Sequence, residues 1–170
     1  MTPRTCRIAV ALAAAALVAC APEVSDTGYA GTWSRGNEIV RSTLAIVESG
    51  SGYLVRWTLT STDGGREVRC DWDGRCEQFS GGELSAEFQL APTVDPGSGN
   101  LFIEGRGTLY TPEGEQEFHF RDELFVRPGH RLVARTREEQ GTVYDGRRGP
   151  KRTFRKVADT VEDPPRQGAE

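Results

Sequence analysis

The chain has 170 residues, with 21 Lys and Arg residues against 25 Asp and Glu residues, so its formal net charge at pH 7 is −4. This acidic balance disfavours nucleic acid as a partner, because binding to it depends on neutralising phosphates. The length suits one domain with a real core, and 20 glycines with few helix-forming windows favour an all-β protein.

The first predicted element is a secretory signal peptide over residues 1–19. Arg4 and Arg7 form its basic start, and an apolar run follows from Ile8 to Val18. A run of this length is typical of a cleaved export signal and is too short to remain as a membrane-spanning helix. We therefore expect an exported protein.

The signal segment ends in Leu17-Val18-Ala19-Cys20, which resembles the lipobox of bacterial lipoproteins. In that family the cysteine is diacylated and becomes the new N-terminus, so the resemblance implies a lipid on Cys20 and attachment to a membrane. Because Ala21 follows, and not an aspartate, the resemblance also implies an outer-membrane lipoprotein that faces the periplasm. Residues 20–30 would be the lipidated N-terminus and a polar tether. An ordinary cleavage site before a cysteine is the alternative.

Strand patterns then continue almost without interruption, and they define an expected β domain over residues 31–158. Tyr53, Val55 and Trp57 illustrate the period of two that marks a half-buried strand. Short turns and the lack of a convincing helix favour an antiparallel up-and-down barrel of about eight strands, since closure removes the sheet edges. A β-sandwich is the alternative. Residues 159–170 carry almost no apolar side chains, so we expect them to be disordered.

Cys70 and Cys76 are predicted to form a disulfide, which is the default for two thiols in an exported protein. A three-residue loop of Trp72, Asp73 and Gly74, with the glycine left-handed, would place the cysteines directly opposite each other. Their Cα atoms would then lie about 4.5 Å apart, within reach of a disulfide. A two-residue Asp73-Gly74 turn would leave them diagonal, so we predict the three-residue hairpin.

Two places interrupt the alternation of the predicted strands. Gly105 and Gly107 occupy positions in phase with apolar residues, which indicates a bent strand or a close approach of another part of the chain. Asp122 shares the phase of Phe120 and Leu124. We expect a β-bulge that rotates this carboxylate outward; the alternative is a polar group inside the barrel that needs partners.

Catalytic motifs are scarce in this sequence. The two histidines, His119 and His130, belong to no recognisable catalytic pattern, and Gly-x-Ser-x-Gly, His-Glu-x-x-His and phosphate-binding glycine loops are absent. Asp71-x-Asp73-Gly74 contains part of a calcium-loop pattern, but turn formation explains it better. We expect no enzymatic activity, no metal and no cofactor.

The tripeptide Gly31-Thr32-Trp33 at the head of the first expected strand resembles the start of the calycins, which include lipocalins and avidin-like barrels. In that family the tryptophan closes one end of the barrel and an arginine from the last strand packs across its ring. The resemblance implies that Trp33 closes the barrel, with Arg155 across its ring or, alternatively, Arg152. It also implies a small hydrophobic ligand in the cup.

Our first functional hypothesis is therefore a lipid-anchored, non-catalytic envelope protein that binds a small apolar ligand inside a calycin-like barrel. The expected ligand-lining residues are Tyr53, Trp57, Phe88, Ile103, Phe118 and Phe120.

A second hypothesis is an interaction protein that uses its surface. The Gly-Thr-Trp opening, export and single disulfide also resemble small barrel inhibitors that Gram-negative bacteria direct against proteases or lysozyme. In that case Trp72 or residues 21–30 would contact a periplasmic protein. Trp72 could equally fold back onto the barrel. A third possibility is an envelope adaptor whose basic segment 127–156 meets anionic lipid or polymer.

Overall fold

The computed structural model describes residues 28–81, 84–140, 142–144 and 149–165. The expected signal peptide, the expected lipidation site Cys20 and most of the tether lie outside these residues. The described part contains β-strands and no helix, which confirms the all-β prediction. A membrane-crossing helix is accordingly absent from the described residues.

In chain order the strands are β1 (Gly31–Gly36), β2 (Val40–Ser49), β3 (Gly52–Ser61), β4 (Arg66–Cys70), β5 (Arg75–Ser80), β6 (Leu84–Val94), β7 (Leu101–Thr111), β8 (Gly114–Arg127), β9 (Arg131–Glu139), β10 (Thr142–Val143) and β11 (Lys151–Ala158).

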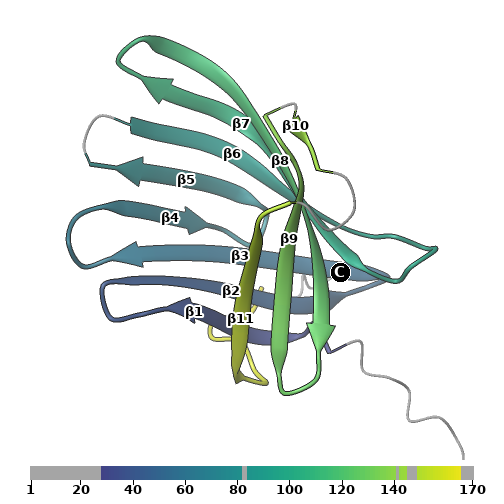
Figure 1. Cartoon of the computed structure of the whole chain (residues 1–170). Helices are drawn as coiled ribbons and strands as arrows, with labels where there is room; N and C mark the ends of the chain where they lie inside the picture. The colour runs from purple at the N-terminus through teal and green to yellow at the C-terminus, as the bar shows by residue number, and fades with distance from the viewer. Residues whose placement is uncertain (1–27, 82–83, 141, 145–148, 166–170) are drawn as a thin grey trace, which may run out of the picture.

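Ten of these strands close into one antiparallel barrel, and one short strand lies beside it (Figure 1). From β1 to β9 each strand pairs with the next one along the chain, and β11 lies between β9 and β1. Strand β10 pairs only with the end of β9. The predicted closed up-and-down order is confirmed, and the sheet does not divide into the two layers of a sandwich.

The barrel has ten strands and not the predicted number of about eight, and two of its strands are short. β1 (GTWSRG) contains one large apolar residue, and β5 (RCEQFS) places Cys76 and Gln78 at its inward positions instead of long apolar side chains. Both are implied by the sequence, β1 by the Gly31-Thr32-Trp33 opening and β5 by the Cys70–Cys76 hairpin, so the expected number of about eight is too low. Their neighbours hold them in register on both sides, so the barrel needs both of them.

One end of the barrel is closed by the residues that enter β1. Tyr29 is buried, and its hydroxyl donates to the Leu124 carbonyl at 2.8 Å and accepts from the Leu101 amide at 3.2 Å. The Trp33 indole donates to the Tyr29 carbonyl at 2.7 Å. Trp33, with 1% of its surface exposed, therefore closes this end of the barrel together with Tyr29.

The cation beside Trp33 is Lys156, and the expected contact with Arg155 is wrong. Lys156 Nζ lies 5.4 Å from the centre of the Trp33 ring. Phe154 is buried inside the barrel, so strand alternation places Lys156 on the same face and exposed Arg155 on the outer face. In the ladder, Arg155 stands opposite Ser34.

The disulfide hairpin lies at the closed end and has the predicted geometry. Cys70 and Cys76 are directly opposite each other, with a Cα–Cα distance of 4.0 Å, and they form a disulfide. The Asp71 amide donates to the Arg75 carbonyl at 2.8 Å, so the loop between them has three residues. Gly74 is in the left-handed region with φ of 86°, which confirms the three-residue hairpin.

Residues 159–165 contact the outside of the closed end, although the sequence predicts disorder for 159–170. Thr32 Oγ1 donates to the Thr160 carbonyl at 2.9 Å, and Arg56 Nη2 donates to the Glu162 carbonyl at 2.8 Å. The Trp72 indole donates to the Asp163 carbonyl at 2.7 Å. Side chains of the barrel thus satisfy backbone carbonyls of a segment that has little apolar surface of its own.

Candidate functional site

The barrel contains a cavity of about 510 Å³ that opens at the end opposite Trp33. The turns after β1, β3 and β7 lie at this end of the barrel, which is at the left of Figure 1. The volume is in the range of sites for small organic ligands. Apolar lining residues include Leu44, Trp57, Leu59, Phe88, Leu90, Ile103, Leu109, Phe118, Phe120, Leu124 and Phe154.

Five of the six expected ligand-lining residues line this cavity, namely Trp57, Phe88, Ile103, Phe118 and Phe120. The sixth, Tyr53, does not line it. Its ring packs edge-on against Tyr29 with centres 5.6 Å apart, at the closed end of the barrel. Tyr53 is near the start of β3, where the strand leaves the closed end, so it is too deep to reach the cavity.

Four aromatic rings form one continuous cluster along the cavity. Phe88 lies at the centre of the cluster, 5.4 Å from Phe118, 6.2 Å from Trp57 and 6.3 Å from Phe120, in tilted or edge-to-face contacts. The Trp57 indole donates to Ser42 Oγ at 2.9 Å, so its polar atom has a partner. The cluster therefore offers a rigid apolar surface of the kind that binds flat or flexible hydrocarbon groups.

Gly105 and Gly107 of β7 make room for these rings, which explains their place in the apolar phase. A Cβ atom at Gly105 would lie 2.1 Å from Phe120 Cε1. A Cβ atom at Gly107 would lie 2.0 Å from the Glu87 carbonyl oxygen and 2.5 Å from the Phe88 Cα atom. Of the two sequence interpretations, the structure supports the close approach.

Asp122 faces into the cavity, so the expectation that a bulge rotates it outward is wrong. A bulge does occur beside it, since Arg121 pairs with Glu138 while Asp122 pairs with Thr136. The extra residue, Arg137, is on β9 and not on β8, so β8 keeps its alternation through this point. Asp122 therefore keeps the inward phase of its neighbours.

Inside the barrel Asp122 has two partners. Thr136 Oγ1 donates to its carboxylate at 2.8 Å, and Arg152 Nη2 forms an ion pair with its other oxygen. Asp122 is 7% exposed and Thr136 is 5% exposed. The carboxylate thus meets the requirement that a buried charge be paired and hydrogen-bonded. Arg152, the alternative partner of Trp33 in the sequence analysis, is engaged here instead.

Two more arginines line the cavity near its mouth. Arg35 is on β1, and its guanidinium group lies 5.7 Å from the centre of the Phe154 ring. Arg66 begins β4, and its Nη2 donates to Gln78 Oε1 at 2.7 Å. Glu139 is the second carboxylate in the lining. The cavity is therefore amphipathic, with apolar aromatic walls and a cationic region near its opening.

Neither Arg35 nor Arg66 is among the predicted site residues, although the sequence contains a signal for both. Arg35 is two residues after buried Trp33, and Arg66 is two residues before buried Val68. A period of two therefore places each guanidinium group on the inner face. Charged residues in strands usually face solvent, so an inward arginine is not expected from the pattern alone. The closed barrel shows that these two inner positions lie at its solvent-accessible mouth.

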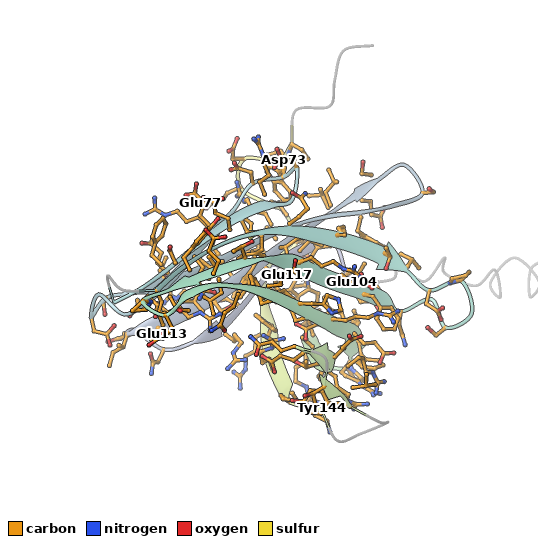
Figure 2. All side chains as sticks on the ribbon, turned by 90° about the horizontal axis from the view of Figure 1, so that it is seen from above. Asp73, Glu77, Glu104, Glu113, Glu117 and Tyr144 are labelled. Carbon is orange, nitrogen blue, oxygen red and sulfur yellow. A yellow bond between two sulfur atoms is a disulfide. The ribbon has the colours of Figure 1, made fainter. Side chains whose placement is uncertain are left out.

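The outer surface carries much of the acidic charge. Asp73, Glu77 and Glu113 are exposed at the periphery of the barrel, as Figure 2 shows. His119 is among the residues that line the cavity, and its Nδ1 atom lies 3.3 Å from Glu138. Within the described residues no group of three or more His, Cys, Asp or Glu side chains is arranged to hold a metal ion.

Comparisons of this chain with protein-family models, with curated proteins and with solved structures find no match.

Trp72, the expected surface contact, folds back onto the molecule. The Arg56 guanidinium group lies 4.8 Å from the centre of its ring, and its indole nitrogen is hydrogen-bonded to the Asp163 carbonyl. Of the two sequence interpretations, the structure supports folding back. The residue is therefore covered on one face by a cation and tied at its edge by the C-terminal segment.

Proposed function

We propose that this chain is a non-catalytic, lipid-anchored lipoprotein of the outer membrane that faces the periplasm and binds a small apolar ligand inside its barrel. The cavity carries this proposal, because solid packing would leave no room for a ligand. Its aromatic walls are held by neighbouring backbone, so they do not need to rearrange before binding. Preformed apolar sites of this volume are typical of small-molecule binding.

The end of the barrel at which the described chain begins fits an anchored binding protein. Residues 28–30 enter the barrel at its closed end, and the mouth lies at the other end. A lipid on Cys20 would hold the closed end toward the membrane and leave the mouth facing the periplasm. A ligand could then enter and leave from the aqueous side.

The contacts of Trp72 favour the cavity over the surface as the functional site. An anchor for a protease or lysozyme would need a free indole ring, whereas this ring is engaged by Arg56 and Asp163. The alternative role as an inhibitor would have to use another segment, such as residues 21–27, which lie outside the described part of the chain.

The binding part of this proposal is tested with N-phenyl-1-naphthylamine, an uncharged probe whose fluorescence rises in apolar surroundings. The mature chain with Cys20→Ala removes the expected lipid and leaves every described residue unchanged. We expect saturable fluorescence with this protein. Ala86→Phe, which fills the cavity from β6, should abolish it, whereas Ala91→Phe on the exposed face of the same strand should not. Equal fluorescence of all three proteins would contradict binding in the cavity.

The anchor is tested separately by labelling cells with a radioactive fatty acid. The wild-type chain should incorporate label and fractionate with the outer membrane, and the Cys20→Ala variant should do neither. Label in both proteins, or in neither, would contradict lipidation at Cys20.

A further inference from the structure

Three guanidinium groups face the same cavity from three different strands. Arg35 comes from β1, Arg66 from β4 and Arg152 from β11, and all three line the cavity. Their Cα positions share the inward phase of Trp33, Val68 and Phe154 respectively. Guanidinium groups remain protonated in proteins, so the mouth region carries three positive charges.

The carboxylates in the lining do not satisfy all three cations. Asp122 is paired with Arg152 and is also hydrogen-bonded to Thr136. Glu139 is exposed at the mouth. Among the described residues, the partner of Arg66 is the neutral amide of Gln78, and that of Arg35 is the face of the Phe154 ring. Neither contact neutralises a charge.

Arg152 lies close enough to Arg35 and Arg66 to repel both, and this repulsion is reflected in the pKa values of Arg35 and Arg66. Burial and then the charge of Arg152 lower the pKa of Arg35. The same two causes lower the pKa of Arg66, and Glu139 opposes them. Arg152 thus acts on both of the other arginines, which places the three cations in one electrostatic environment. An anion among them would relieve this repulsion.

Arg152 also has an unused donor inside the barrel. Its Nε atom is buried and has no hydrogen-bond partner among the described residues, although its Nη2 atom is engaged by Asp122. A buried donor without a partner is costly. The described residues therefore balance the charge of Arg152 through Asp122 but leave its hydrogen-bonding capacity incompletely used.

We propose that the ligand is an amphiphile with a single anionic head group, a carboxylate or a phosphate monoester, held by Arg35, Arg66 and Arg152 near the mouth while its hydrocarbon part lies along the Trp57, Phe88, Phe118 and Phe120 rings. This proposal rests on the proposed function, because it names the chemical class of the ligand in the same cavity. Planar guanidinium groups match the oxygens of carboxylates and phosphates in a bidentate manner, which suits both head groups. A cationic site inside an acidic protein also selects against cationic amphiphiles.

The test compares probes that share one hydrocarbon chain and differ in the head group. Binding of dodecanoate, dodecyl phosphate, dodecanol and dodecyltrimethylammonium is measured by displacement of N-phenyl-1-naphthylamine from the Cys20→Ala protein, below the micelle concentration of each probe. We expect each anion to bind about tenfold or more tightly than dodecanol, in keeping with charge-assisted hydrogen bonds. The cation should bind most weakly. The relative affinities of dodecanoate and dodecyl phosphate show which head group the site prefers.

The variant Arg35→Gln/Arg66→Gln should remove most of the preference for anions, so that dodecanoate and dodecanol bind to it with similar affinity. It leaves the Asp122–Arg152 pair intact, so loss of the fold is not expected. Arg155→Gln, which removes a cation from the outer face of β11, is the matched control and should behave like the parent.

Each other outcome contradicts a different part of the account. Dodecanol binding as tight as that of the anions would overturn the assigned head group and leave the cavity function standing. A preference for anions that survives in the double variant would overturn the role of Arg35 and Arg66. Failure of every probe, including N-phenyl-1-naphthylamine, would overturn the proposed function itself.

Discussion

Asp122 and Arg152 form an ion pair inside the barrel, between two strands that are not neighbours in the sheet. Asp122 is on β8 and Arg152 is on β11, and β9 lies between them and contributes Thr136 to the same cluster. The pair therefore links three successive strands around the point where the barrel closes. It also places one negative and one positive charge side by side in the wall of the cavity.

Replacing Asp122 with Asn should destabilise the protein. The change leaves Arg152 without its counter-charge in a partly buried site, and we expect a loss of about 1–3 kcal/mol in the free energy of unfolding. Urea unfolding followed by circular dichroism measures this loss. Glu104→Gln, which removes a carboxylate from the outer ion pairs with Arg106 and Arg121, is the control and should change stability by less than about 0.5 kcal/mol. Equal effects of the two changes would count against the internal pair.

Gly105→Ala should damage both packing and ligand binding. The added methyl group would overlap Phe120, which must move into the cavity, and overpacking of this kind costs about 1–3 kcal/mol. The Gly52→Ala change on β3 is the control, since a Cβ atom there meets nothing within 4 Å. Unfolding midpoints and probe affinity are compared for the two variants. Unaltered probe affinity in Gly105→Ala would show that Phe120 does not shape the site.

Reduction of the Cys70–Cys76 disulfide should lower stability without opening the barrel. The disulfide closes a short loop, and the chain-entropy account predicts a loss of about 2 kcal/mol on its removal. The double variant Cys70→Ser/Cys76→Ser should lose the same amount, and a reductant should then have no further effect on it. If a reductant still lowers the stability of the double variant, the loss of stability does not come from the Cys70–Cys76 disulfide.

Tyr29 should make stability depend on pH in the alkaline range. Burial raises the pKa of its hydroxyl above the ordinary value of 10.0, and the hydrogen bond from the Leu101 amide opposes this effect. A raised pKa means that Tyr29 stabilises the folded state below pH 10.0, and that this contribution is lost as the pH rises through the folded pKa.

The ultraviolet absorbance of tyrosinate measures this titration directly. One tyrosine of the folded protein should ionise later than the others, and the late step should be missing from Tyr29→Phe. The variant should also be about 1 kcal/mol less stable at neutral pH, since the Leu124 carbonyl and the Leu101 amide lose their partner. A late step that remains in the variant would assign it to another tyrosine.

The parts of this structure that local chemistry determines are the parts that the sequence predicts. Cys70, Cys76 and the Asp73-Gly74 sequence between them specify the hairpin, because left-handed glycine and disulfide reach allow one register. Regular alternation likewise predicts the barrel and five of the apolar residues that line its cavity. The expected strand count is too low, although the predicted hairpin already requires the short strand β5.

The parts that depend on distant strands are not visible in one stretch of sequence. A bulge does lie beside Asp122, but its extra residue, Arg137, is on the neighbouring strand β9, and one strand's own pattern does not show which strand carries the bulge. Likewise, the register between β1 and β11 places Lys156 opposite Trp33, and the sequence of β11 alone does not show this register. The cationic mouth arises only when β1, β4 and β11 close around one space. Such features require the topology as well as the pattern.

Native mass spectrometry of the protein extracted from its own membrane tests the central claim most directly. The account predicts a population with one retained small molecule, of a mass equal to that of an anionic amphiphile, and this mass should be absent when the cavity is filled by Ala86→Phe. A wild-type protein that never retains a molecule, and that also takes up no probe in solution, would contradict the claim that this barrel binds a ligand.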